Sequence, residues 1–410
     1  MRRLAALVAA AGLAVAMGPA APAAAAPGPP NAPEYWFDSW GVPALWSSGA
    51  RGQGVTIAEI DSGVNAALPE LAGRVVPGTD LGVGGDGQVD RERSSFGHGT
   101  AMASIMVARP GLLDITGLAP DAKVLPVAVP LTGTTDAQRP DRLPDAIRYA
   151  ADHGAKIINM SVGGLRDPAT DDTPCPEDEQ QAVFHALGKG AVVVASVGNT
   201  GPTRNTVEEP AVCLGVVSVG AVDRQGVVAS FSAREPFLTV TAPGVDIPSL
   251  GRTAGDAFSG DGTSQATALV SAALALAWSA HPQLTNRQLV ARLLATVDGR
   301  RTTPSSADGY GRLDAGTLVR ARVPADAPNP VFAAAAPFSE REARLDRVQP
   351  VPPKPAADTP LPTGGYAVAG HPRFTDRARR ATGVSAAGLV ALLAVVAVGT
   401  QRRRRRRQAF

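Results

Sequence analysis

Three short stretches carry side chains from which a nucleophilic active site could be built. They read EIDSGV around Asp61, FGHGTAMASIM around His98 and SGDGTSQATA around Ser264. A serine hydroxyl is a weak nucleophile unless an imidazole removes its proton, and a carboxylate can hold that imidazole in the required tautomer. Each stretch alone has a simpler explanation, because Asp-Ser-Gly is a common turn and Gly-Thr-Ser a plausible helix N-cap. Together, in this order, they predict Ser264 as nucleophile, His98 as general base and Asp61 as the acid that orients it.

The elements that must position these residues alternate between two hydrophobic patterns. Short apolar runs that end in Gly, Asp, Asn or Pro predict buried parallel strands; they lie at 54–61, 154–164, 190–199, 215–223 and 237–244. Helical patterns lie at 143–154 and 177–190, and an all-apolar helix is expected from Ser264 to about Ala280. A further helix follows, with Thr285 and Gln288 as a capping box. Strands alternating with helices predict a doubly wound, mainly parallel α/β sheet with helices on both faces, and ligands at the strands' carboxyl ends.

The three motifs, together with KIINMSVGG (156–164) and VVVASVGNTG (192–201), resemble those of the subtilisin-like serine proteases from about Gly52 to Ala315. The resemblance implies a peptide hydrolase with Asp61, His98 and Ser264 as its triad. It implies two oxyanion donors, the backbone N–H of Ser264 and the side chain of Asn199, although Asn199 could also be a simple turn residue. It implies that the substrate pairs with a strand edge at Ser161, Val162, Gly163 and Gly164. The alternative is that these residues are simply the end of a strand.

One departure from the family pattern lies four residues after the nucleophile. The family usually has proline there, and this chain has Ala268. Both residues fit the start of a helix. The change therefore puts the rigidity of the nucleophile in question rather than its identity.

Both ends of the chain carry hydrophobic targeting signals. Residues 1–26 have a basic start, an apolar segment and Ala-x-Ala choices, which predict a secretory signal peptide, with a disordered alanine-rich tail as the alternative. Residues 381–400 contain no charge, which predicts a transmembrane helix; a buried core helix is the alternative. The tail at 401–410 contains Arg402 to Arg407, so the positive-inside rule places it in the cytoplasm and the body outside.

The net charge of +2 depends on those six arginines. Without them, 33 basic residues face 37 acidic ones, so the body is mildly acidic and nucleic-acid binding is not expected. The arginine run itself could bind nucleic acid, but its place directly behind a span favours lipid headgroups.

The only two cysteines are Cys175 and Cys213. In an exported domain they are expected to form a disulfide, although two unrelated thiols are the alternative. No His/Asp/Glu cluster has the spacing of a transition-metal site, so neither metal nor cofactor is expected. Acidic residues at 79–92 could bind calcium, but a solvated loop is favoured because the spacing is not that of an EF-hand.

The expected layout resembles the mycosins, membrane-anchored proteases associated with type VII secretion in actinobacteria. That resemblance implies a protein or peptide substrate, anchoring in the cytoplasmic membrane through residues 381–400, and association with the secretion machinery. Two alternatives remain, a generic cell-surface subtilisin and a weakly active scaffold that stabilises a membrane complex. The expected segments are a signal peptide 1–26, an aromatic lead-in 27–50 packed on the domain, a protease domain 51–322, a Pro/Ala-rich linker 323–380, a span 381–400 and a tail 401–410.

Overall fold

A seven-stranded parallel sheet forms the centre of the molecule in the computed structural model, which describes residues 34–138, 141–165, 175–201, 205–335 and 367–368. The strand order is β2-β3-β1-β4-β6-β8-β9, and every neighbouring pair is parallel. The expected α/β class with a mainly parallel sheet is confirmed. The bounds are β1 Thr56–Asp61, β2 Thr79–Asp80, β3 Lys123–Ala128, β4 Ile157–Met160, β6 Val192–Ser196, β8 Val217–Val222 and β9 Val240–Pro243.

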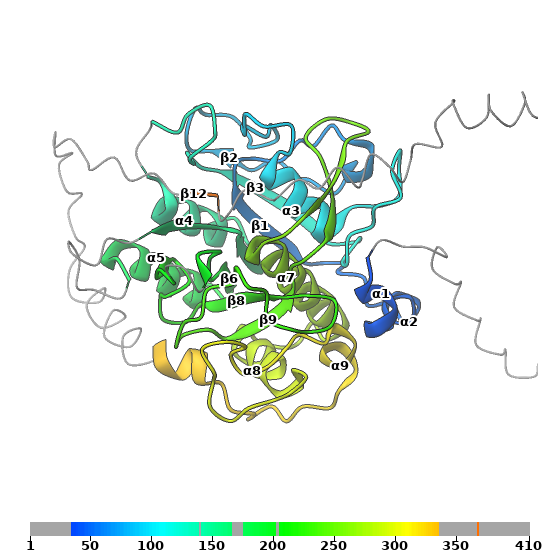
Figure 1. Ribbon diagram of the computed structural model, residues 1–410, viewed down its shortest axis with the longest axis vertical. Coiled ribbons are helices and arrows are strands. Elements are labelled where there is room, and N and C mark those ends of the chain that lie inside the picture. The colour runs from blue at the N-terminus through cyan, green and yellow to red at the C-terminus, as the bar shows by residue number, and fades with distance from the viewer. Residues whose placement is uncertain (1–33, 139–140, 166–174, 202–204, 336–366, 369–410) are drawn as a thin grey trace, which may run out of the picture.

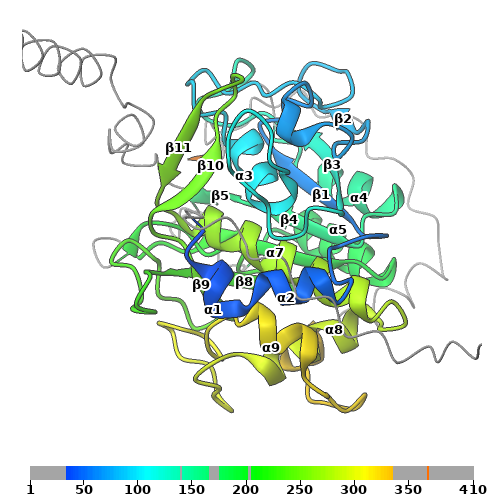
Figure 2. The same cartoon turned by 90° about the vertical axis from the view of Figure 1, so that its right-hand side faces the viewer.

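Helices cover both faces of this sheet, which explains why its strands are apolar on both sides. Ile57 packs into a core with α3 (His98–Val107) and α7 (Thr263–Ala280). Its neighbours Ala58 and Ile60 point the other way, into a second core with α4 (Leu143–Asp152) and α5 (Glu177–Gly188). Figure 1 shows α4 and α5 on the side of the sheet away from α7, and in Figure 2, with α7 towards the viewer, they lie behind the sheet.

Helix α7 is the central buried helix that the apolar run after Ser264 predicts. Every residue from Thr263 to Trp278 is buried, and Ala268 is fully enclosed in an unbroken helix. The predicted capping box of α8 (Asn286–Thr296) is also present, with both Thr285 and Gln288 bonded to the other's backbone N–H. Helix α9 (Ala315–Arg320) packs against α7 and α8.

The stretch 154–164 does not form one strand as expected. The chain leaves the main sheet at Ser161, so that β4 is followed by a separate strand, β5 (Val162–Leu165). β5 lies between β12 (Ala367–Val368) and β7 (Glu208–Glu209) in a small antiparallel sheet. The remaining described elements are β10 Ile247–Leu250, β11 Ala257–Gly260 and the 3-10 turn Pro69–Leu71.

Residues 34–50 of the expected lead-in form two short helices, α1 (Trp36–Trp40) and α2 (Val42–Ser47), against the domain. Trp36 and Phe37 are buried, and the rings of Phe37 and Trp46 meet edge to face with centroids 5.2 Å apart. The indole N–H of Trp46 donates to the carbonyl of Leu118 at 3.0 Å.

Part of the expected linker also packs on the domain. Phe332 is buried, the guanidinium of Arg287 lies 5.2 Å from its ring centroid, and Asn329 donates to the Arg287 carbonyl. Residues 1–26 and 381–410 lie outside the described part of the chain. Within the described ranges, no helix is both long and apolar enough to cross a bilayer.

Because Trp36 is only 2% exposed, Trp36→Ala should lower the free energy of unfolding by about 3–5 kcal/mol. Chemical denaturation followed by circular dichroism measures the change. Val227→Ala is the control, since Val227 is 61% exposed and its loss should change stability by no more than about 0.5 kcal/mol. Equal effects of the two substitutions would show that the lead-in does not stabilise the domain.

Candidate active site

The candidate residues meet where three adjacent parallel strands end. Asp61 is the last residue of β1, Ser161 follows β4, and Asn199 lies three residues beyond β6. Helix α3 begins with His98, and Ser264 is the second residue of α7. The carboxyl edge of the sheet therefore collects all the sequence-predicted catalytic and oxyanion residues, as expected for a doubly wound fold.

Asp61 and His98 form a buried hydrogen bond. Nδ1 of His98 lies 2.8 Å from Oδ2 of Asp61, and the two residues are 1% and 0% exposed. Oδ1 of Asp61 accepts from the backbone N–H of Ser62. Burial alone would lower the pKa of His98, but the charge and hydrogen bond of Asp61 outweigh it and raise that pKa. The contact thus favours the imidazolium that a general base becomes.

This contact requires the first turn of α3 to approach the end of β1 very closely. A Cβ at Gly99 would overlap the carbonyl oxygen of Gly63 and lie 3.2 Å from the Cβ of Asp61. Gly97, at the N-cap of α3, has the left-handed φ of 65° that glycine adopts without strain. Glycine at these positions permits the approach.

Asn199 is held beside the start of α7 by its side-chain oxygen. Oδ1 accepts from both the N–H and the hydroxyl of Thr263, at 2.9 and 3.0 Å. The amide nitrogen faces Gly262, where an added Cβ would lie 3.5 Å from it. Ser264 is in the first turn of α7, so its backbone N–H has no partner within the helix. The two predicted oxyanion donors are therefore close neighbours.

Ser264 and Ser161 exchange hydrogen bonds. Oγ of Ser264 donates to the carbonyl of Ser161 at 2.9 Å, and Oγ of Ser161 donates to the carbonyl of Ser264 at 3.0 Å. Among the described residues, no hydrogen bond joins Ser264 to His98. Catalytic hydrogen bonds often tighten only when substrate binds, so the Ser264 hydroxyl must turn towards the imidazole for reaction.

A buried acid that the sequence analysis did not single out lies beneath the site. Glu59 accepts from Nδ2 of Asn159 at 2.8 Å, and the same amide donates to Oγ of Ser161. The hydroxyl of Ser271 in α7 donates to Oδ1 of Asn159. Burial, with the charge of nearby Asp61, raises the pKa of Glu59 well above its ordinary value, which favours the protonated carboxyl. The sequence signal that could have identified Glu59 is its position as a charged residue inside the apolar run 54–61.

The acidic loop at 79–92 is solvated only in part. Residues 83–86 are exposed as expected, but Asp80, Asp90 and Glu92 are buried. Glu92 accepts from the backbone N–H of His98 at 2.5 Å, and Asp90 accepts from the hydroxyl and N–H of Thr100. Glu92 and Asp90 fix the first turn of α3, which explains why these two acids are buried.

The predicted substrate strand begins where the chain leaves the main sheet and continues into the small one. Ser161 lies beside Ser264, and the other three residues, Val162 to Gly164, belong to β5. Val162 and Gly163 pair antiparallel with Val368 and Ala367 of β12. One edge of β5 therefore accepts an extended strand next to the nucleophile.

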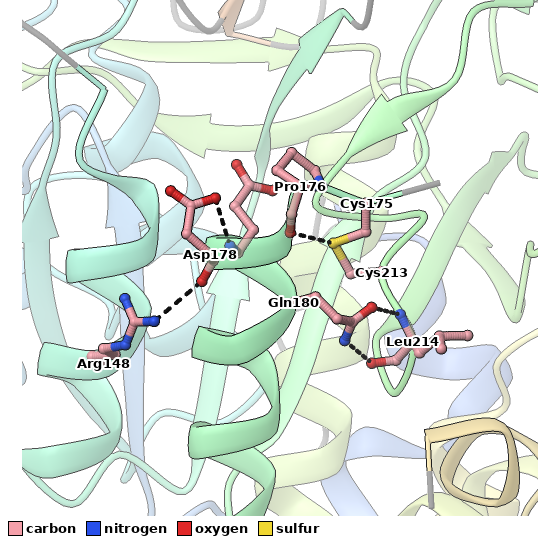
Figure 3. Close-up of a disulfide and its surroundings, with 8 residues drawn as sticks. Arg148, Cys175, Pro176, Asp178, Gln180, Cys213 and Leu214 are labelled. Carbon is pink, nitrogen blue, oxygen red and sulfur yellow. Dashed lines mark hydrogen bonds between the residues drawn. A yellow bond between two sulfur atoms is a disulfide. The ribbon is translucent and has the colours of Figure 1, made fainter. Parts of the chain in front are cut away.

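The predicted disulfide between Cys175 and Cys213 is confirmed, with their Cα atoms 5.0 Å apart. It joins the segment before α5 to the segment after β7 (Figure 3). Gln180 reinforces the link, because its amide donates to the carbonyl of Leu214 and accepts from the Leu214 N–H, at 3.0 and 2.8 Å. In the described part of the chain, the one group spaced for a metal adds Glu179 to these cysteines, whose sulfurs are already bonded to each other.

A second acid that the sequence analysis missed is Glu208 of β7. It is 4% exposed, and its carboxylate accepts a hydrogen bond from the backbone N–H of Asn199. Burial raises its pKa to about 8, and the Asn199 bond opposes part of that rise.

The fold and these contacts agree with what comparisons with known proteins show. Residues 52–311 match the subtilase family of peptidases, and the chain belongs to that family. It is 35% identical over 271 residues to subtilisin E of Bacillus subtilis, covering 64% of this chain and 65% of that one. It is 37% identical to a thermophilic serine proteinase of a Bacillus species, covering 54% of this chain and 50% of the relative. The chain thus spans half to two thirds of the length of these relatives.

Two solved structures with similar folds are mycosins. MycP1 from Mycobacterium smegmatis superimposes with a TM-score of 0.61 at 26% identity, covering 71% of this chain and 85% of that one. The MycP3 protease from the type VII (ESX-3) secretion system superimposes with a TM-score of 0.60 at 28% identity, covering 72% and 90%.

Glu59→Gln should remove a pH dependence of stability. Because the folded protein holds the pKa of Glu59 above that of the unfolded chain, unfolding releases a proton between the two values, and rising pH favours unfolding. Urea denaturation should show the parent losing stability relative to Glu59→Gln as the pH rises above about 4.3, the ordinary pKa of a glutamate.

The control for this substitution is Glu59→Leu. It leaves the Asn159 amide with one acceptor fewer, and should lower stability by about 1–3 kcal/mol across the same pH range. Parallel pH profiles for the parent and Glu59→Gln would contradict the raised pKa of Glu59.

Proposed function

We propose that this chain is a serine endopeptidase in which Asp61, His98 and Ser264 act as a catalytic triad. The observation that carries the proposal is the buried 2.8 Å contact between Asp61 and His98, at the sheet edge where Ser264 begins α7. The contact holds the imidazole in one tautomer and orientation, which is what a general base requires.

The first half of the reaction forms an acyl-enzyme. The Ser264 hydroxyl leaves the Ser161 carbonyl, its proton passes to Nε2 of His98, and Oγ bonds to the scissile carbonyl carbon. The carbonyl π electrons move to oxygen, where Nδ2 of Asn199 and the N–H of Ser264 stabilise the oxyanion. The intermediate then breaks its C–N bond, and His98 donates its proton to the leaving amine.

In the second half, His98 takes a proton from water while the water oxygen attacks the acyl carbon. The C–Oγ bond of the second intermediate breaks, and the proton returns to Ser264. Asp61 stays ionised throughout and stabilises the imidazolium in both halves. The substrate backbone pairs with Val162 and Gly163 of β5, in the place and direction of β12.

A fluorophosphonate probe should label the parent protein at Ser264. Ser264→Ala should abolish labelling, and Ser264→Ala, His98→Ala and Asp61→Asn should each reduce kcat/KM for peptide hydrolysis by on the order of 10⁴-fold or more. Mass spectrometry of the labelled peptide identifies the site. Labelling that survives Ser264→Ala would contradict the nucleophile assignment, and a folded but unlabelled parent would favour the scaffold alternative.

We further propose that the protein is anchored in the cytoplasmic membrane and acts outside it with type VII secretion machinery. Support for the anchor comes from the uncharged segment 381–400 and the arginines behind it. Support for the secretion role comes from the likeness to MycP1 and to MycP3, the latter described as a protease of a type VII secretion system. The signal peptide at 1–26 would direct export.

Deleting residues 381–410 should move the protein from the membrane fraction to the extracytoplasmic soluble fraction, because the proposed span is lost. Full-length Ser264→Ala is the control and should remain in membranes. Affinity purification of the full-length protein from detergent-solubilised membranes should also recover secretion-complex components. Their absence, with anchoring intact, would favour a generic cell-surface subtilisin.

A further inference from the structure

Glu208 is a buried acid that forms no ion pair with a described residue of opposite charge. In β7 it pairs with Leu165 of β5, on the edge of β5 opposite to β12. Among the described residues, no lysine, arginine or histidine forms an ion pair with it. A buried carboxyl without a cation is costly to ionise, so the fold disfavours the charged form of Glu208.

The Glu208 side chain turns back towards the catalytic edge. A Cβ at Gly198 would overlap its carboxyl, and one at Gly163 would lie 2.7 Å from its Oε2. The same carboxylate accepts from the N–H of Asn199. The Glu208 carboxyl therefore lies between β5 and the segment that carries Asn199, directly against Gly163 and Gly198.

The register of β12 indicates which substrate residue faces this place. A peptide bound in the position of β12 pairs two residues with Gly163 and Val162, and its next residue lies opposite Ser161. Ser161 is hydrogen-bonded to Ser264, so that residue, P1, carries the carbonyl to be attacked. Asn199 holds that carbonyl, and the side chain of P1 lies on the side of Gly163 and Gly198 that the Glu208 carboxyl faces.

We propose that Glu208 determines specificity by binding a lysine or arginine side chain at P1. This inference rests on the proposed peptidase function and names its substrate class. A basic side chain that reaches Glu208 pairs with a carboxyl that is otherwise buried without a cation, so its binding relieves the cost of ionising that carboxyl. The raised pKa of Glu208 is consistent with this, because an empty subsite leaves the acid desolvated.

The test compares fluorogenic peptides that differ only at P1, with arginine, lysine or leucine. The parent should cleave the basic peptides with a higher kcat/KM than the leucine peptide. Glu208→Gln retains an acceptor for the Asn199 N–H and nearly the same volume, but has no charge. It should lower kcat/KM for the basic peptides by about 10- to 100-fold, the value of one charged hydrogen bond, and change the leucine peptide by less than about 3-fold.

Glu209→Gln is the matched control, because it removes one charge from the same two-residue strand. It should leave the ratio of basic to leucine cleavage unchanged. Peptidyl phosphonates ending in arginine or leucine, which acylate the nucleophile without turnover, should show the same preference in their labelling rates.

The outcomes separate the two proposals. Fluorophosphonate labelling of Ser264 without any preference for basic P1 would overturn the role of Glu208 alone. An equal loss on all peptides in Glu208→Gln would also overturn it, because it would assign Glu208 only a structural role at Asn199. Failure of every probe to label the folded parent would overturn the peptidase function, and the P1 proposal with it.

Discussion

The hydrogen bond between Asp61 and His98 requires α3 to begin in close contact with the end of β1. Much of the surrounding structure follows from that requirement. Glycines permit the backbones to approach, and the buried acids of the 79–92 loop then bind the first turn of α3 from the other side. The loop therefore belongs to the frame of the site. Without it, the imidazole would have a carboxylate partner but no fixed helix to carry it.

The nucleophile side of the site has its own support, made of polar groups that water does not reach. Asn159 connects Glu59 in β1 with Ser161 after β4 and Ser271 in α7. Because these hydrogen bonds join β1, the end of β4 and α7, the network helps to specify how α7 sits on the sheet. Burial and the charge of Asp61 raise the pKa of Glu59, which favours its protonated form and so avoids two adjacent charges beneath the site.

The sequence predicted those parts of the site that local pattern encodes. Asp61, His98, Ser264 and Asn199 could be singled out because each lies in a short motif at the end of an apolar run, and α7 because its run is uniformly apolar. Glu59 and Glu208 could not be interpreted, because their partners Asn159 and Asn199 are supplied by other strands or loops. The break between β4 and β5 was missed for a similar reason. Val162 and Gly163 continue an apolar run, and only pairing with β7 and β12 separates them from the sheet.

The disulfide has a consequence for how the substrate strand can open. Cys175 and Cys213 close a single stretch of chain that contains α5, β6, Asn199 and β7. β7 therefore cannot fray away from β5 on its own. Cys213, which follows β7, is bonded to Cys175 just before α5, and α5 packs on the main sheet. Local opening of β7 therefore also has to move Cys213 and, through the disulfide, the chain at the start of α5.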